Sequence, residues 1–252
     1  MIEIFILSLI QGITEFLPIS SSSHLILSSE YLNFKNQNLS IDVSLHIGSF
    51  IAVIFYFYKD LIKFFENKFL FFKIFISSIP VITVGYILIN LGVMEKIRNL
   101  EVIAWTTFLF GLLLFISDQF KIDKNIKKDF TLRKAIFIGI LQVLSLVPGV
   151  SRSGIAITAA RFLNFKRIDS AKISFLISIP ILGAVSIFGL KNVIFSNDIN
   201  FTKINLIAIF LSFLISFITI KYFLIYINKF SLNVFVFYRI VLGLILLFFT
   251  YL

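Results

Sequence analysis

The strongest restriction on the fold of this chain is a series of long stretches without Asp, Glu, Lys or Arg. A helix needs about 20 apolar residues to cross about 30 Å of hydrocarbon. Five stretches qualify if their ends reach the headgroups, and a sixth segment contains only Arg239. The predicted spans are 43–58, 74–94, 102–117, 173–190, 204–220 and 233–252. We therefore expect an all-α polytopic membrane protein with six transmembrane helices.

Composition supports a membrane location and argues against other classes. Hydrophobic residues make up 59% of the 252 residues and charged residues 14%, whereas a soluble domain is roughly half apolar and roughly a quarter charged. The net charge of +10 comes from basic residues in short loops between apolar stretches. This distribution is typical of residues that determine membrane topology, and it requires no nucleic acid partner. Cysteine is absent, which excludes disulfides and thiolate metal sites.

Four shorter apolar segments are interrupted in pairs by Pro18 and Pro148. The pairs are 2–17 with 21–32, and 134–147 with 151–163. Proline removes a backbone donor and biases its predecessor away from helix, so each pair should form helix, break and helix. Such short segments suit two re-entrant helical hairpins, because broken backbone at membrane depth must be buried in protein or line a wet cavity.

The two hairpins are similar in sequence and predict an inverted repeat. Leu17-Pro18 matches Val147-Pro148, Ser21 matches Ser151, and Ser23 matches Ser153. Three spans follow each hairpin, and because three is odd, the second copy enters the membrane upside down. We expect a single integral membrane domain over 1–252, with repeat one at about 1–118 and repeat two at about 133–252.

Basic residues predict the orientation. The loops 59–73, 118–134, 161–172 and 221–229 carry 16 Lys and Arg residues, and the opposite face carries five, including Lys35. Cytoplasmic loops are enriched in Lys and Arg, so the first face should be cytoplasmic. Both termini and the entrance of the first hairpin would then lie outside.

Polar side chains gather around the first break. Gln11 and Glu15 have i, i+4 spacing, and Ser21 and His24 have i, i+3 spacing just after Pro18. Because charged groups within a membrane are costly, they are functional candidates by default. Glu15, assisted by Gln11, is the predicted ligand of Mg²⁺ or Ca²⁺.

The second break carries an arginine. Arg152 lies between Ser151 and Ser153 at a predicted helix start, where free N–H groups favour an anion. Two such helix starts meeting across the repeat would bind a phosphate or diphosphate. The predicted substrate contacts are Arg152, Ser151, Ser153, Ser20, Ser22 and Gly149.

Simpler roles stay open for these residues. The serines could merely cap a helix, and Glu15 with Arg152 could form a buried ion pair without chemistry. Asp42 and His46, at i, i+4 near a span start, are weaker candidates. Arg239 could pair with a buried acid, snorkel to the interface, or form a second anion contact.

At these residues the chain resembles the undecaprenyl-diphosphate phosphatase family, the bacterial membrane phosphatases linked to bacitracin resistance. The resemblance rests on "QGITEFLPISSSSHLIL" and "PGVSRSGIAIT", and it extends to "DVSLHIGSFIAVIFYF", "ISFLISIPILGA" and "VFYRIVLG". It implies hydrolysis of undecaprenyl diphosphate to the monophosphate carrier lipid and a requirement for a divalent cation. It also implies a protein of the inner membrane whose site is open to the periplasm.

The resemblance also assigns roles and shows departures. Gln11 and Glu15 hold the acidic-motif positions, Ser21 and His24 the Ser/His positions, and Arg152 the phosphate-clamp position. Many members have Glu in place of Gln11, Thr-Gly in place of Ser22-Ser23, and Thr in place of Ala156, with Thr158 two residues further on.

The expected activity is therefore recycling of a polyprenyl diphosphate lipid for cell-wall synthesis. We favour attack by Ser21 with His24 as general base, over direct attack by His24 or by water activated by the acid and histidine. The alternative function is a lipid-phosphate flippase or ion-coupled transporter that uses the same anion site. The sequence leaves a homodimer open.

Overall fold

Helices form nearly all of the regular structure. The structure is a computed structural model that describes residues 1–32, 34, 38–66, 68–195 and 203–252. Within these residues the β pairing is limited to an isolated bridge between Lys124 and Phe165. Lys35, one of the basic residues used to predict orientation, lies outside the described residues.

Among the described residues, six helices are long and apolar enough to cross a membrane. They are α3 (Leu39–Tyr56), α5 (Lys68–Asn90), α7 (Leu100–Asp118), α11 (Arg167–Phe195), α12 (Lys203–Lys229) and α13 (Asn233–Tyr251). The predicted number of spans is confirmed, and each helix contains most of one predicted stretch. Several extend beyond the charge-free stretch to include lysines, whose apolar stems can lie along the helix while the ammonium reaches the interface.

The remaining helices include those that flank the two prolines. They are α1 (Ile2–Thr14), α2 (Ser21–Leu32), α9 (Leu132–Gln142), the 3₁₀ helix η1 (Val143–Leu146), α10 (Arg152–Phe162), and the short α4 (Tyr58–Glu66), α6 (Val93–Lys96) and α8 (Ile126–Asp129). We call residues 15–20 the first break and residues 147–151 the second break.

Helices α1 and α9, which precede Pro18 and Pro148, end earlier than the sequence predicts. α1 ends at Thr14 rather than at Leu17, and α9 changes to the tighter η1 after Gln142. A proline ring clashes with the carbonyl four residues earlier, which is residue 14 for Pro18 and residue 144 for Pro148. The α-helical pattern is therefore lost about one turn before each proline.

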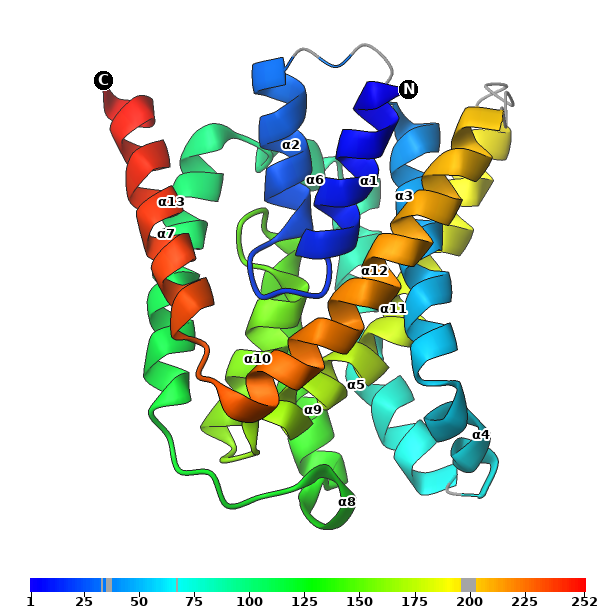
Figure 1. The fold of residues 1–252 in the computed structure, drawn as a ribbon, viewed down its shortest axis with the longest axis vertical. Coiled ribbons are helices and arrows are strands. Elements are labelled where there is room, and N and C mark those ends of the chain that lie inside the picture. The colour runs from blue at the N-terminus through cyan, green and yellow to red at the C-terminus, as the bar shows by residue number, and fades with distance from the viewer. Residues whose placement is uncertain (33, 35–37, 67, 196–202) are drawn as a thin grey trace.

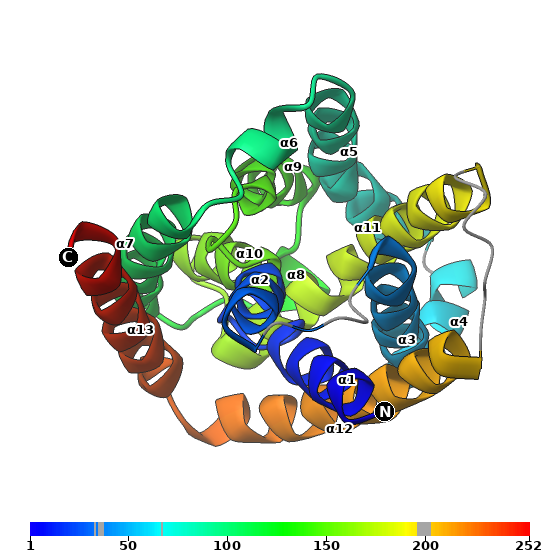
Figure 2. The same cartoon turned by 90° about the horizontal axis from the view of Figure 1, so that it is seen from above.

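The spans surround the helices that follow the breaks. Seen from above, α2 and α10 lie inside a ring that includes α3, α11, α12, α7 and α13 (Figure 2). Close pairs depend on small residues: a Cβ at Gly48 of α3 would lie 2.4 Å from the Ile209 carbonyl oxygen of α12. Ser49 of α3 also hydrogen-bonds Ser212 and Ser216 of α12, at 3.2 and 3.0 Å. Such contacts are typical of helices packed in a membrane.

The two ends of the molecule differ in charge. The N- and C-termini lie at one end of the long axis, and α4 and α8 lie at the other (Figure 1). The basic loops 59–73 and 118–134 therefore lie at the end opposite the termini. Near that end, buried Asp118 pairs with Arg161 and Arg167 at 3.3 and 2.7 Å, and it accepts a hydrogen bond from the Leu232 N–H. This cluster ties the end of α7 to α10, α11 and the start of α13.

Candidate active site

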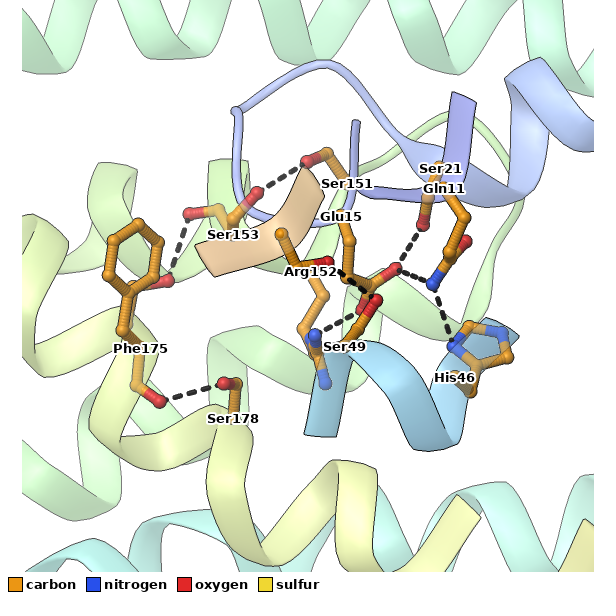
Figure 3. A network of polar contacts seen from close by, with 12 residues as sticks. Gln11, Glu15, Ser21, His46, Ser49, Ser151, Arg152, Ser153, Phe175 and Ser178 are labelled. Atoms are coloured by element: carbon orange, nitrogen blue, oxygen red, sulfur yellow. Dashed lines mark hydrogen bonds and ion pairs between the residues drawn. The ribbon is translucent and has the colours of Figure 1, made fainter. Parts of the chain in front are cut away.

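Glu15, in the first break, is the centre of a buried polar network. Its side chain accepts hydrogen bonds from Gln11 Nε2 at 3.0 Å and from Ser21 Oγ at 2.5 Å. Its other carboxylate oxygen forms an ion pair with Arg152 of α10. Glu15 is only 6% exposed, so these partners replace the water that would otherwise stabilise its charge. Figure 3 shows Gln11, Ser21 and Arg152 converging on this carboxylate.

The two helix starts bring Ser21 and Arg152 to the same carboxylate. Ser21 is the first residue of α2 and Arg152 the first residue of α10. The residues before them, Ser20 and Ser151, both have positive φ, at 77° and 70°. Such backbone costs about 1–3 kcal/mol per residue and persists where the surrounding structure enforces it. The strained serines thus direct the first side chain of each helix toward Glu15.

The other predicted contacts mainly support the breaks. Ser151 Oγ accepts from the Gly154 N–H at 3.1 Å, so Ser151 is an N-cap, the simpler of its two expected roles. Ser153 Oγ donates to the Leu17 carbonyl at 2.7 Å and joins the two breaks directly. Gly149 has φ of 91°, and a Cβ there would lie 1.9 Å from Thr106 Oγ1. Only glycine fits this crossing of the second break over α7.

The serines of the first break form a small hydroxyl cluster. Ser20 Oγ contacts Ser22 Oγ at 3.3 Å and Ser23 Oγ at 3.1 Å. Ser22 is exposed, whereas Ser20 and Ser23 are buried. The cluster lies beside the helix start and leaves Ser22 accessible to a bound molecule.

Of the three roles considered from the sequence for Arg239 of α13, the acid partner and snorkelling are wrong, and the second anion contact stays a prediction. Its guanidinium is fully buried and donates to the carbonyls of Pro18, Gly149 and Val150, at 3.1, 2.8 and 3.1 Å. Among the described residues it has no carboxylate partner, so pairing with a buried acid is wrong, and burial contradicts snorkelling. Arg239 instead holds both breaks, because broken backbone leaves carbonyls that need donors.

His24 does not pair with Ser21, although their i, i+3 spacing predicts that the two side chains share one helix face. His24 Nδ1 lies 2.6 Å from the Ser20 carbonyl oxygen, and Nε2 lies 2.5 Å from the hydroxyl of Tyr238. Ser21, at the first position of α2, turns instead toward Glu15. Tyr238 was not a sequence candidate; its position well inside a span, next to Arg239, was the available signal.

The chain is similar in sequence to known proteins over nearly its whole length. A family model described as bacitracin resistance protein BacA matches residues 4–245. The chain belongs to the BacA family. A protein named undecaprenyl-diphosphatase from Pelagibacter ubique (strain HTCC1062) is 48% identical over 251 residues, covering 99% of this chain and 98% of the relative. Proteins of the same name from Jannaschia sp. (strain CCS1) and Saccharophagus degradans are 39% and 42% identical, covering 98% and 94% of this chain and 98% and 93% of each relative.

In this member of the BacA family, His46 extends the network beyond the two breaks and the helices that flank them. His46 Nδ1 of α3 lies 3.0 Å from Gln11 Nε2. Because the same Gln11 nitrogen donates to Glu15, the residue links α3 to the carboxylate. In the sequence, His46 is a minor candidate because of its i, i+4 spacing with Asp42. Only the packing of α3 beside α1 brings it to the site.

The BacA resemblance implies a divalent cation, and the donors around Glu15 fit one. Gln11 Oε1 is buried and has no hydrogen-bond partner among the described residues, so this amide oxygen is free to bind a ligand. Carboxylate and amide oxygens are ligands that Mg²⁺ and Ca²⁺ prefer. The described residues contain no cluster of three or more His, Asp or Glu side chains.

Proposed function

We propose that this protein is an undecaprenyl-diphosphatase, which hydrolyses undecaprenyl diphosphate to undecaprenyl phosphate and inorganic phosphate. Membership of the BacA family and the names of its relatives support the activity. The observation that carries the site is the convergence of Ser21 and Arg152, from two helix starts, on buried Glu15. One arrangement thus combines a hydroxyl, a carboxylate and a guanidinium, as phosphoryl transfer requires.

Arg152 is the proposed clamp for the diphosphate. Its guanidinium pairs with Glu15, and its side chain is 15% exposed, so it is accessible from one side. A guanidinium can bind two phosphate oxygens at once, and the free N–H groups at the start of α10 add to the attraction. The charge on the phosphate that builds up during transfer is therefore neutralised at this point.

Ser21 is the proposed nucleophile, with Glu15 as its base. As Ser21 Oγ bonds to the terminal phosphorus, its proton moves to Glu15 and the P–O bond to undecaprenyl phosphate breaks. Water then attacks the phosphoserine, inorganic phosphate leaves, and Ser21 regains a proton. The 2.5 Å contact between Ser21 Oγ and Glu15 Oε2 supports this pairing. Glu15 and Gln11 would hold a divalent cation, which supplies charge neutralisation on the phosphates.

We further infer that the two hairpins are re-entrant and form an inverted repeat within one domain. Each break contains a proline and a positive-φ serine, and each is followed by a helix whose first residue reaches Glu15. By this criterion Ser20 corresponds to Ser151 and Ser21 to Arg152, which differs by one residue from the sequence alignment that pairs Ser21 with Ser151. The basic loops lie at one end of the molecule and favour a cytoplasmic position for it, which leaves both termini and the site facing outward.

The transporter alternative has weaker support. The relatives compared above are named for a phosphatase activity, and a carrier would need an anion site without a serine hydroxyl held against a carboxylate. The protein is thus best described as a hydrolytic enzyme in a multi-pass fold of a bacterial inner membrane.

The purified protein in detergent is expected to release inorganic phosphate from undecaprenyl diphosphate. Chelation of divalent cations should abolish the release, and added Mg²⁺ or Ca²⁺ should restore it, because donors around Glu15 suit such a cation. Phosphate release with and without chelator measures both points. Movement of labelled lipid between vesicle leaflets without phosphate release would contradict the proposal and support a carrier.

Replacing Ser21 by Ala is expected to reduce kcat by at least about 10³-fold, since the variant lacks its nucleophile. Replacing His24 by Ala should cost less, about 10- to 100-fold, because the histidine does not contact the attacking hydroxyl. Rapid quenching with substrate labelled in the terminal phosphate should detect phosphoserine in the wild type. A His24 variant that is more impaired than the Ser21 variant would assign the attack to His24.

A further inference from the structure

We propose that Tyr238 is a positioning residue for His24, fixing which ring nitrogen carries the proton and where the ring lies. The inference rests on the proposed phosphatase function for its effect on turnover, while the contact itself is independent of that function. The segment "VFYRIVLG" contains Tyr238, but neither the sequence pattern nor the family resemblance assigned this tyrosine a role.

Hydrogen-bond chemistry determines the tautomer. A carbonyl oxygen can only accept, so Nδ1 of His24 donates to Ser20 at 2.6 Å. In the neutral imidazole, Nε2 must then accept, and the hydroxyl of Tyr238 donates to it at 2.5 Å. The two rings are also nearly parallel, with centroids 5.7 Å apart and an interplanar angle of 15°. Both nitrogens of the His24 ring are therefore held.

Tyr238 can hold His24 because its own helix is held in register. The next residue, Arg239, donates to carbonyls of both breaks, including Pro18 of the first and Gly149 of the second. Ser20, which binds His24 Nδ1, lies two residues after Pro18. One turn of α13 therefore fixes the backbone that anchors the histidine and also supplies the hydroxyl that orients it.

The contact separates His24 from the proton of Ser21. Ser21 Oγ donates to Glu15, whereas the acceptor nitrogen of His24 faces Tyr238. Tyr238 is 40% exposed, so the pair lies on the accessible side of the buried Glu15 network. His24 is therefore not the acceptor of the Ser21 proton in this arrangement, and Tyr238 sets the orientation of the His24 ring.

A double-mutant cycle tests the role in turnover. Tyr238→Phe keeps the aromatic ring and removes the hydroxyl; we expect kcat to fall about 3- to 10-fold with little change in KM. In a His24→Gln background the same substitution should have no further effect, because Tyr238 acts through His24. The matched control is Tyr251→Phe, another tyrosine of α13, whose hydroxyl donates to Glu101 at 2.7 Å far along the helix. This control should leave kcat unchanged.

Nitrogen NMR tests the contact without relying on activity. The chain has two histidines, so ¹⁵N-histidine labelling with a His46→Asn variant assigns the His24 signals. We expect a protonated Nδ1 and an unprotonated Nε2, and a shift of the Nε2 signal in Tyr238→Phe but not in Tyr251→Phe. Unchanged His24 signals in Tyr238→Phe would overturn the contact. Additive kcat losses in the cycle would overturn the positioning role. A wild type without phosphatase activity would refute the proposed function while the NMR result still decides the contact.

Discussion

Replacing Arg152 by Ala should reduce the rate of phosphate release by at least about 10³-fold, the magnitude typical for an arginine that neutralises a transferring phosphoryl group. The substitution removes the clamp and also leaves Glu15 buried without its ionic partner. Steady-state phosphate release from undecaprenyl diphosphate gives the measurement. Arg152→Lys should show an intermediate loss, because lysine keeps the charge but cannot bind two oxygens with a planar fork.

Arg167→Ala provides the matched control for Arg152. Arg167 also pairs with a buried carboxylate, but it lies at the end of the molecule that carries the basic loops, and Asp118 keeps Arg161 as a second partner. The control should retain its turnover. If Arg152→Ala remains as active as this control, with a comparable melting temperature, the Glu15–Arg152 pair is a structural ion pair and the clamp is wrong.

The second large effect is expected for Arg239→Met, which should lower the free energy of unfolding by at least about 3 kcal/mol and abolish activity. The substitution leaves the carbonyls of Pro18, Gly149 and Val150 without their donor, and an unpaired buried polar group costs about 1–3 kcal/mol. Unfolding in mixed micelles measures the stability. Hydrogen exchange of the peptides that cover the two breaks should increase in the variant.

Two comparisons separate this effect from a general loss of charge. Arg239→Lys keeps a positive charge but cannot reach the separated carbonyls of both breaks, so it should rescue little stability. Arg133→Met, at an exposed position at the start of α9, should change stability by no more than about 0.5 kcal/mol. Unchanged protection of the breaks in Arg239→Met would show that other contacts hold them.

Sequence alone predicted most of the fold because the membrane imposes simple rules. A charge-free stretch of sufficient length must be helical in hydrocarbon, and all six predicted spans correspond to helices. Prolines located both breaks to within a few residues, although the helices before them end about one turn earlier than expected. The repeat and its inversion stay predictions, supported by the one positive-φ serine in each break, Ser20 and Ser151.

The site was predicted in part for a related reason. Glu15, Ser21 and Arg152 were recognisable because polar groups beside breaks are costly in a membrane unless they have a role. Their mutual contacts confirm that the two breaks meet. The pairing of Ser21 with Glu15 rather than His24 was not predictable, because i, i+3 spacing describes neighbours on one helix and ignores a carboxylate from the preceding break.

The sequence by itself determined the spans, the breaks and the identity of the charged residues, since each follows from local hydrophobicity and backbone chemistry. Only the tertiary structure decided which partners those residues have. Arg239 could have met an acid, lipid headgroups or a substrate phosphate, and its guanidinium donates to carbonyls of both breaks and of α7. Tyr238 and His46 reach the site from distant helices, through packing of α13 and α3 that no local pattern encodes. Long-range contacts depend on how whole helices pack, so they appear only when the helices are assembled.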